Sequence, residues 1–246
     1  KDKSGFDTYY KITQAAYPAE NWFEYKTDYI DKHYTMEEKI ASYDEMITDN
    51  SITEFACQMF GDMFMAGKSM DGISVDLSNT YLLKAQDAYK KAFSMNANNF
   101  AAAFNAGISY YNQFSVLDDK VAENIRTLQS LNTNRPAPSK DPKKKLLEDA
   151  KFKASIDSVK KLNVALDQPI LVKVDAAIEW IEKAYNNLKD KDKFTKPEKN
   201  VISRSVDFLA TLYSYKRDKS RGKDQKAYDE FDAKYNFYDT LHDKYQ

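Results

Sequence analysis

The segment from residue 81 to residue 113 constrains the fold more than any other part of the chain. Two apolar stripes at helical spacing occur in it, separated by the polar pair Asn98-Asn99. The first stripe contains Ala85, Tyr89, Ala92 and Phe93. The second contains Phe100, Ala103, Ala106, Gly107, Tyr110 and Tyr111. This pattern predicts two helices joined by a tight turn, and Gly107, which has no Cβ, would let a partner helix approach closely.

The same segment resembles the tetratricopeptide repeat (TPR). Residues 85–89 fit the A-x3-F motif of that family, and residues 103–110 fit its W-x2-L-G-x2-Y motif, with Ala97 where the family usually has proline. The resemblance implies antiparallel helix pairs that stack into a right-handed array.

Further segments carry the same two signatures in the same order. Residues 57–64 and 206–213 fit the first-helix motif, with Gly61 and Ala210 at the small position. Residues 177–185 and 227–231 fit the second-helix motif. These matches predict three repeat units. The aromatic stripe of Trp22, Tyr25 and Tyr29 indicates a candidate fourth unit near the N-terminus.

Several segments interrupt the repeats. Residues 67–79 are rich in Gly, Ser and Asp and predict a loop between two paired helices. The helix after Phe114 should end near Leu131, and a Lys-rich helix should follow over residues 141–167, with Pro169 separating it from the next unit. We therefore expect an inserted helical hairpin at about residues 115–167.

The fold class follows from these patterns. We predict an all-α, TPR-like right-handed helical-hairpin array that forms a single domain over residues 1–246, with the long inserted hairpin and a terminal capping helix at about residues 224–246. Six glycines and six prolines are too few for an all-β fold with many tight turns. Thr35 followed by Glu38 predicts a capping box at the start of a helix over residues 35–48.

The TPR resemblance also implies a concave groove lined by first helices. The positions that face the groove in the family fall on Ala101 and on four residues that we expect to bind a partner: Phe104, Ile108, Tyr111 and Asn112. Aromatic contacts and an Asn side chain that reaches peptide backbone suit an extended or helical peptide. In the alternative, Phe104 and Ile108 pack against the long insertion, because such an insertion must lie against some surface.

Catalytic and metal-binding patterns are missing from the sequence. His33 and His242 are far apart and have no Cys or carboxylate at metal-ligand spacing. Cys57 is the single cysteine and lies among apolar neighbours, which favours a buried inert thiol. We find no Gly-rich phosphate loop, no Ser/His/Asp order and no HExxH motif. The sequence therefore predicts no catalytic residue, no metal site and no cofactor.

Two basic clusters, Lys140 to Lys145 and Lys216 to Lys226, raise the question of polyanion binding. In the second cluster Asp218 and Asp224 alternate with the cations, which favours a solvated turn over a nucleic-acid surface. The formal net charge of -1 gives no overall field towards DNA or an anionic membrane. We expect no nucleic-acid partner.

Two functional hypotheses remain. The first is a non-enzymatic scaffold that binds a protein or peptide in the concave groove. The alternative is an envelope ligand- or glycan-binding protein that uses exposed aromatic residues, since the chain has 18 tyrosines whose faces can stack on sugars. No apolar run is long enough to span a bilayer.

The location of the protein is inferred from resemblance. Interrupted repeats of this kind resemble a group of bacterial envelope TPR proteins, which are often secreted or lipid-anchored. The chain begins at Lys1 without an initiator methionine, as expected if an export signal or lipid anchor had been removed. We therefore expect the bacterial envelope or periplasm, with the cytoplasm as the alternative.

Overall fold

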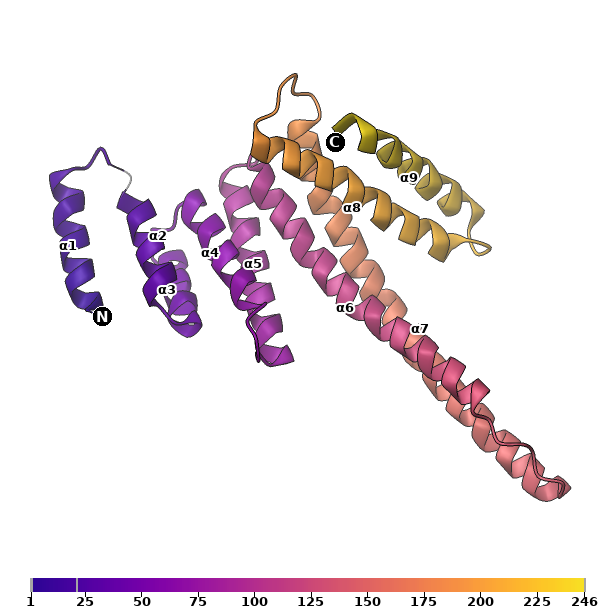
Figure 1. Cartoon of the computed structure of the whole chain (residues 1–246). Coiled ribbons are helices and arrows are strands. Elements are labelled where there is room, and N and C mark those ends of the chain that lie inside the picture. Colours follow the sequence, from indigo (N-terminus) through magenta and orange to yellow (C-terminus); the bar gives the residue numbers. More distant parts are fainter. Residues whose placement is uncertain (1, 21, 246) are drawn as a thin grey trace. The chain divides into compact units, whose positions relative to one another are not determined.

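The computed structural model describes residues 2–20 and 22–245, and its regular secondary structure is helical throughout these residues (Figure 1). The predicted all-α class is confirmed. The helices are α1 (Lys3–Ala16), α2 (Trp22–His33), α3 (Met36–Thr48), α4 (Glu54–Gly67), α5 (Val75–Met95), α6 (Phe100–Thr133), α7 (Pro142–Leu188), α8 (Lys196–Ser220) and α9 (Gln225–Tyr245).

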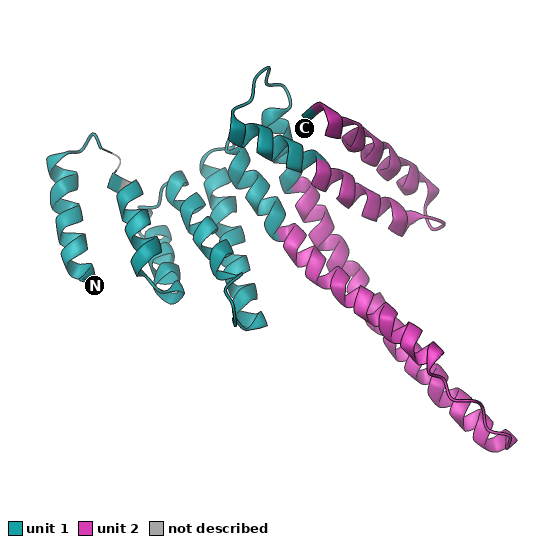
Figure 2. Cartoon of the chain, in the orientation of Figure 1, with its two compact units in different colours: residues 1–109, 180–206, 245–246 teal, residues 110–179, 207–244 magenta. Residues whose placement is uncertain are grey.

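The chain forms two compact units, each built from separate stretches of sequence (Figure 2). Unit 1 comprises residues 1–109, 180–206 and 245–246, and unit 2 comprises residues 110–179 and 207–244. Helices α6, α7, α8 and α9 each contribute residues to both units. The single domain over residues 1–246 stays a prediction.

The centre of unit 1 is the antiparallel pair of α4 and α5. A Cβ atom at Gly61 would lie only 2.5 Å from Cε1 of Tyr89, so the ring packs directly on the glycine backbone. The Tyr89 hydroxyl donates a hydrogen bond to Asp62 Oδ1 at 2.7 Å. Just past the C-terminus of α5, Asn96 donates to Glu54 Oε1 at 3.0 Å, which sets the register of the pair. Small residues at the crossing therefore allow the close approach.

Aromatic rings fill the space beside this pair. Tyr43 of α3 lies edge-on to Phe60 and Phe64 of α4, with ring centroids 5.5 Å and 5.7 Å apart. All three side chains are buried, and the Tyr43 hydroxyl donates to Asp87 Oδ2 at 3.0 Å. Burial, the Asp87 charge and this hydrogen bond raise the pKa of Tyr43 far above its ordinary value, so the phenol stays neutral.

Unit 2 is organised around an antiparallel hairpin made by the parts of α6 and α7 within residues 110–179. Asn124 Nδ2 donates to Asn163 Oδ1 at 2.7 Å, and Arg135 pairs with Asp149 at 2.5 Å near the connection. At the other end of this unit α8 packs on α6. The ring centroid of Phe114 in α6 lies 4.9 Å from that of Tyr215 in α8.

Helix α9 covers α8 within unit 2. The rings of Tyr213 and Tyr238 stack at a centroid distance of 5.8 Å, and both side chains are buried. Arg217 of α8 lies 3.3 Å from Asp232 of α9 and adds an ion pair to this interface. The aromatic positions that the sequence assigned to a helix pair here are thus packing residues.

Three predicted boundaries are wrong. Helix α7 continues through Pro169, which we expected to separate two units. Ile170 and Val174 are fully buried, and this burial offsets the backbone hydrogen bond that a proline removes. Helix α5 begins at Val75, so the predicted loop over residues 67–79 is shorter. Helix α8 extends to Ser220, which makes the start of the second basic cluster helical.

The aromatic stripe near the N-terminus also differs from expectation. Tyr25 is 62% exposed and does not join a packed stripe. Tyr29 instead stacks on Phe6 of α1, with ring centroids 3.7 Å apart. Packing in this region therefore depends on α1.

Two helices begin with a capping box. Thr35 and Glu38 form the predicted one at the start of α3. At the start of α8, Thr195 N donates to Glu198 Oε2 at 2.8 Å and Glu198 N donates to Thr195 Oγ1 at 3.5 Å. The Glu198 carboxylate also accepts hydrogen bonds from Lys191 and from the Thr195 hydroxyl. The Lys191 bond first, then the bonds from the Thr195 N–H and hydroxyl, lower the pKa of Glu198 from 4.5 to about 2.

The Glu198→Gln variant should therefore lose stability at neutral pH but not in acid. A carboxyl with a lowered folded-state pKa stabilises the fold above its unfolded pKa near 4.5, and this contribution disappears as the pH falls towards 2. Urea unfolding of the wild type and the Glu198→Gln variant at several pH values measures this contribution. The gap between their midpoints should narrow steadily below pH 4.5, and a gap independent of pH would contradict this account.

Candidate functional site

Two of the four predicted partner-binding residues lie in unit 1. Phe104 is only 2% exposed, and the guanidinium carbon of Arg204 in α8 lies 5.0 Å from its ring centroid. Ile108 is half-buried. Phe104 is therefore buried and contacts α8, whereas packing of Phe104 and Ile108 against the insertion stays a prediction.

The other two predicted residues lie in unit 2. Tyr111 is half-buried between two rings, with its centroid 4.6 Å from Phe208 and 5.6 Å from Phe114. Burial raises the pKa of Tyr111 above its usual value. Asn112 is half-buried as well. Phe104 and Tyr111 thus both pack against other side chains, and partner binding by these four residues stays a prediction.

Unit 1 contains a more accessible candidate, which we call the apolar cleft. It has a volume of about 530 Å³ and lies among the start of α3, the connection between α4 and α5, and the first turns of α5. Its lining residues are Tyr34, Thr35, Met36, Glu37, Lys39, Met70, Asp71, Gly72, Ile73, Leu77 and Tyr81.

Apolar side chains in this cleft are open to solvent. Met70 is 55% exposed and Leu77 is 38% exposed. Met36 packs against the backbone of Gly67, where an added Cβ would overlap the end of its side chain. Gly72 adopts φ +75, a left-handed conformation that lets the connection turn back towards α5. Methionines adapt their shape to a ligand, so this lining suits an apolar side chain of variable form.

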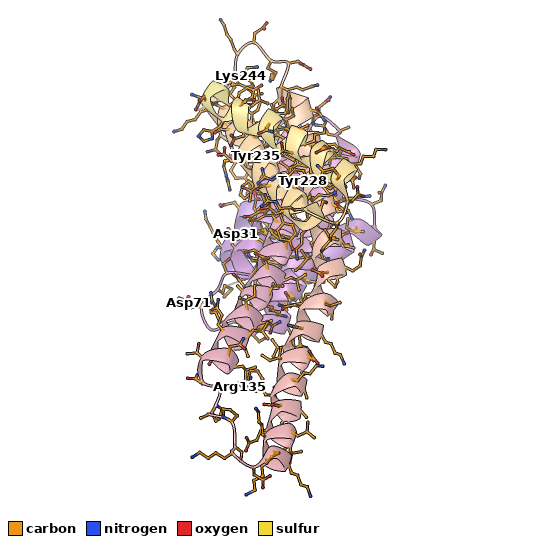
Figure 3. All side chains as sticks on the ribbon, turned by 90° about the vertical axis from the view of Figure 1, so that its right-hand side faces the viewer. Asp31, Asp71, Arg135, Tyr228, Tyr235 and Lys244 are labelled. Carbon is orange, nitrogen blue, oxygen red and sulfur yellow. The ribbon has the colours of Figure 1, made fainter. Side chains whose placement is uncertain are left out.

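The charged groups of the apolar cleft are mainly acidic. Glu37 and Asp71 contribute carboxylates, while Lys39 pairs with Asp31 at 2.6 Å; Figure 3 labels Asp31 and Asp71. The pKa of Glu37 lies below its ordinary value, chiefly because of its own backbone N–H at the start of α3 and then the Thr35 hydroxyl. The cleft therefore combines an apolar lining with negative charge near its edge.

Sequence reasoning missed this cleft because residues 67–79 were interpreted as a polar loop. The available signal was the presence of three apolar residues in this segment: Met70 and Ile73 lie in the connection, and Leu77 lies in α5. Only the structure brings these residues next to Met36 and Tyr81.

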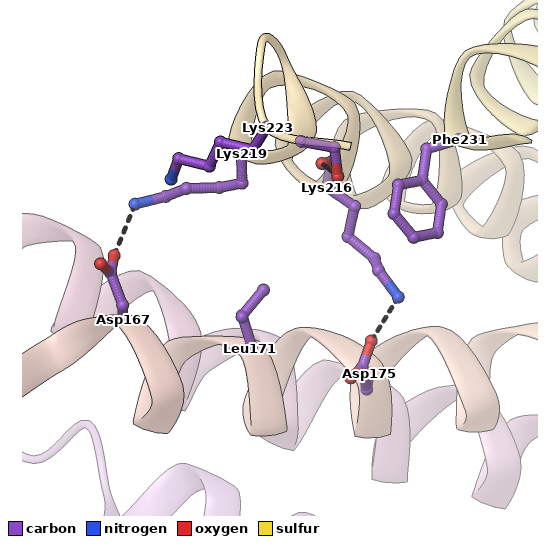
Figure 4. A pocket seen from close by; sticks show the side chains of 8 residues that line it. Asp167, Leu171, Asp175, Lys216, Lys219, Lys223 and Phe231 are labelled. Carbon is purple, nitrogen blue, oxygen red and sulfur yellow. Dashed lines mark hydrogen bonds and ion pairs between the residues drawn. The ribbon is translucent and has the colours of Figure 1, made fainter. Parts of the chain in front are cut away.

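A second hollow lies in unit 2 among α7, α8 and α9 (Figure 4). Two ion pairs cross it: Lys219 to Asp167 at 2.9 Å and Lys216 to Asp175 at 2.6 Å. Leu171 points into the space between them. Lys216 and Lys219 of the second basic cluster thus stabilise the contact of α8 with α7. The sequence did not predict this role.

A third hollow, of about 430 Å³, also lies in unit 2 and is polar. His242 Nδ1 lies 2.6 Å from Asp207 Oδ1, and this hydrogen bond raises the pKa of His242 above its ordinary value. The hollow is lined by Asp207, Ala210, Thr211, Ser214, Tyr235, Tyr238, Asp239 and His242. Hydroxyl, carboxylate and aromatic groups occur together in it.

Two sequence expectations concern inert features. Cys57 is fully buried as predicted, and burial raises the pKa of its thiol to about 11. Within residues 2–20 and 22–245, no group of three or more His, Cys, Asp and Glu side chains could hold a metal ion. In the same part of the chain, no helix combines the length and the apolar character needed to cross a bilayer.

Comparison with known proteins adds no relative. No protein-family model, no curated protein and no solved structure matches this chain. The candidate sites are therefore argued from their geometry alone.

The Asp207→Asn variant should lower the pKa of His242 towards 6.5, because the neutral amide no longer stabilises the imidazolium. NMR titration of the imidazole protons measures the shift, with a His242→Gln sample to assign the resonance. The raised pKa stabilises the fold below pH 6.5 and this contribution disappears as the pH rises through the folded-state value. An unchanged titration in the variant would show that the ion pair does not form in solution.

Proposed function

We propose that the protein is a non-enzymatic interaction scaffold whose apolar cleft binds a peptide or protein partner. The observation that carries the proposal is the solvent exposure of Met70 and Leu77 in a cleft with acidic residues at its edge. The chemistry of this cleft suits a peptide that inserts an apolar side chain and presents a Lys or Arg to Glu37 and Asp71.

Energetics support a peptide over a small ion. Full burial of one apolar side chain is worth about 1.5–3 kcal/mol, and a hydrogen-bonded charge pair at the rim adds up to about 1 kcal/mol. A peptide that combines these two anchors gains about 2.5–4 kcal/mol, which corresponds to a dissociation constant of about 1 mM or weaker. This range suits a reversible scaffold.

A TPR-like arrangement of the helices is part of the same proposal. A TPR-like array is supported by the α4–α5 pair, in which Gly61 and Tyr89 occupy the small and the aromatic positions of the two TPR motifs. The buried positions Ala177, Ile181, Val206 and Leu209 agree with two further motif matches. Antiparallel pairs of this kind expose helix surfaces for partners.

A second candidate function is the binding of a glycan or a similar polyhydroxy ligand. The polar hollow of unit 2 favours it, because Asp207 and Asp239 can accept hydrogen bonds from sugar hydroxyls while Tyr235 offers an aromatic face. A rise in melting temperature with one sugar, absent in Asp239→Asn, would favour this function over peptide binding.

Localisation in the bacterial envelope remains part of the proposal and is supported by the resemblance to interrupted TPR proteins of that compartment. The first residues of the full gene product would test it directly, since a signal peptide or a lipid-attachment cysteine can be recognised in sequence.

A charged substitution in the cleft should weaken peptide binding. We expect Leu77→Asp to weaken binding of peptides with one apolar anchor next to Lys or Arg by at least 10-fold, because the anchor loses its apolar contact. Peptides selected from a random display library on the wild-type protein provide the ligands, and fluorescence polarisation provides the affinities.

Leu83→Asp is the matched control, since Leu83 is also an exposed leucine of α5 but does not line the cleft. The control should bind as the wild type does, and both variants should keep the wild-type melting temperature within a few degrees. Equal loss in both variants, or full binding by Leu77→Asp, would contradict the assignment of the cleft.

A further inference from the structure

The outward face of α7 in unit 2 carries an apolar stripe that the rest of the hairpin leaves exposed. Leu146 is 73% exposed and Val164 is 70% exposed, although both are aliphatic side chains. We call this surface the lysine-flanked face. Its exposed apolar members are Leu146, Leu147, Ala150, Ala154, Leu162, Val164 and Ala165.

The stripe lies on one side of the helix. Leu146, Ala150 and Ala154 follow one another at intervals of four residues, which places them on one face. The side towards α6 contains different residues: Phe152 and Ile156 are half-buried, and Asn163 accepts the hydrogen bond from Asn124. The lysine-flanked face is therefore not needed to hold the hairpin together.

Lysines surround this stripe. Of the acids of this part of α7 and the residue before it, three are engaged by backbone N–H groups or by Arg135, and the fourth, Asp157, lies three residues after Ala154. Asp141 accepts the backbone N–H of Lys143 at 2.9 Å, and Glu148 accepts that of Ser139 at 3.0 Å. Asp149 pairs with Arg135, which Figure 3 labels near the end of the hairpin. In the described part of the chain no acid forms an ion pair with the surrounding lysines Lys140, Lys143, Lys144, Lys145, Lys151, Lys153, Lys160 and Lys161.

The local charge is opposite to that of the whole chain. Residues 120–161 contain 11 Lys and Arg against 5 Asp and Glu, a net charge of +6, whereas the whole chain has a net charge of -1. Lys143, Lys144 and Lys145 also lie in the first turn of α7, where the helix dipole disfavours cations. Helix stability thus gives no reason for the cluster.

We propose that the lysine-flanked face binds the surface of an anionic lipid bilayer. The helix lies in the plane of the bilayer, with the leucines inserted at the boundary of headgroups and acyl chains and the lysines against the anionic headgroups. Residues 143–165 span about 33 Å at the rise of an α-helix, so the contact involves many headgroups at once.

The same observations disfavour other occupants. A second copy of this hairpin would place a second charge of +6 against the first, at a cost that grows as the two faces approach. Nucleic acid would pair with the lysines, but its recognition uses aromatic platforms or base contacts and leaves exposed leucines without a role. A bilayer accounts for both the cations and the aliphatic stripe.

Co-sedimentation of the whole chain with lipid vesicles tests the proposal. Vesicles of phosphatidylglycerol mixed equally with phosphatidylcholine should bind the protein at least about 10-fold more strongly than pure phosphatidylcholine, and high salt should weaken the binding. Sedimentation that is absent, or equal for both vesicles, would overturn the proposal.

Three variants separate the contribution of the lysine charges from that of the inserted leucines. Lys143→Glu, Lys144→Glu and Lys145→Glu together should weaken binding by at least about 100-fold, since each lysine near the surface contributes about 5-fold. A control triple of Lys90→Glu, Lys193→Glu and Lys226→Glu changes the net charge equally on exposed, scattered lysines, and it should keep most of the affinity.

Leu146→Ser combined with Leu147→Ser should weaken binding about 10-fold or more, because the inserted aliphatic surface is lost. If this double variant bound vesicles as the wild type does, the face would be a simple polycation site for another polyanion, and the proposal would be wrong. Circular dichroism of each variant verifies that the helices remain folded, as expected for substitutions at exposed positions.

Discussion

The structure of unit 1 depends on the direct contact between the backbone of Gly61 and the ring of Tyr89. This contact brings α4 and α5 close enough for the other small residues of the pair, such as Cys57 and Ala92, to be fully buried. The hydrogen bond from the Tyr89 hydroxyl to Asp62 keeps the ring from rotating away while its polar atom stays satisfied. Interiors packed in this way tolerate little added volume, so one added methyl group at the crossing would lower the free energy of unfolding.

Unit 2 uses a different balance of interactions. Aromatic contacts such as Tyr213 on Tyr238 bury the apolar surface, while the ion pairs of Lys216 and Lys219 with aspartates of α7 contribute only modestly because they are half-exposed. The two candidate binding surfaces, the apolar cleft and the lysine-flanked face, lie in unit 1 and unit 2 respectively. Both expose apolar side chains to solvent, such as Met70 and Leu77 in the cleft and Leu146 and Val164 on the lysine-flanked face.

Helical periodicity predicted the all-α class and the capping box at Thr35, because both are local properties of the sequence. The pattern could not predict that α7 continues through Pro169, since burial of Ile170 and Val174 decides it and burial depends on distant residues. For the same reason the sequence could not predict the contact of Phe104 with Arg204, which lies 100 residues later in the chain. The apolar cleft escaped notice because its members come from separate segments.

A double-mutant cycle at Gly61 and Tyr89 tests the close helix contact most directly. Added volume at a packed crossing costs about 1–3 kcal/mol, against a gain of about 1 kcal/mol in helix propensity for Gly→Ala. We therefore predict that Gly61→Ala lowers the free energy of unfolding by up to about 2 kcal/mol in the wild-type background and leaves it unchanged or raises it in the Tyr89→Leu background, where the ring is absent. Stabilisation by Gly61→Ala in the wild-type background would contradict the close contact on which this account of unit 1 rests.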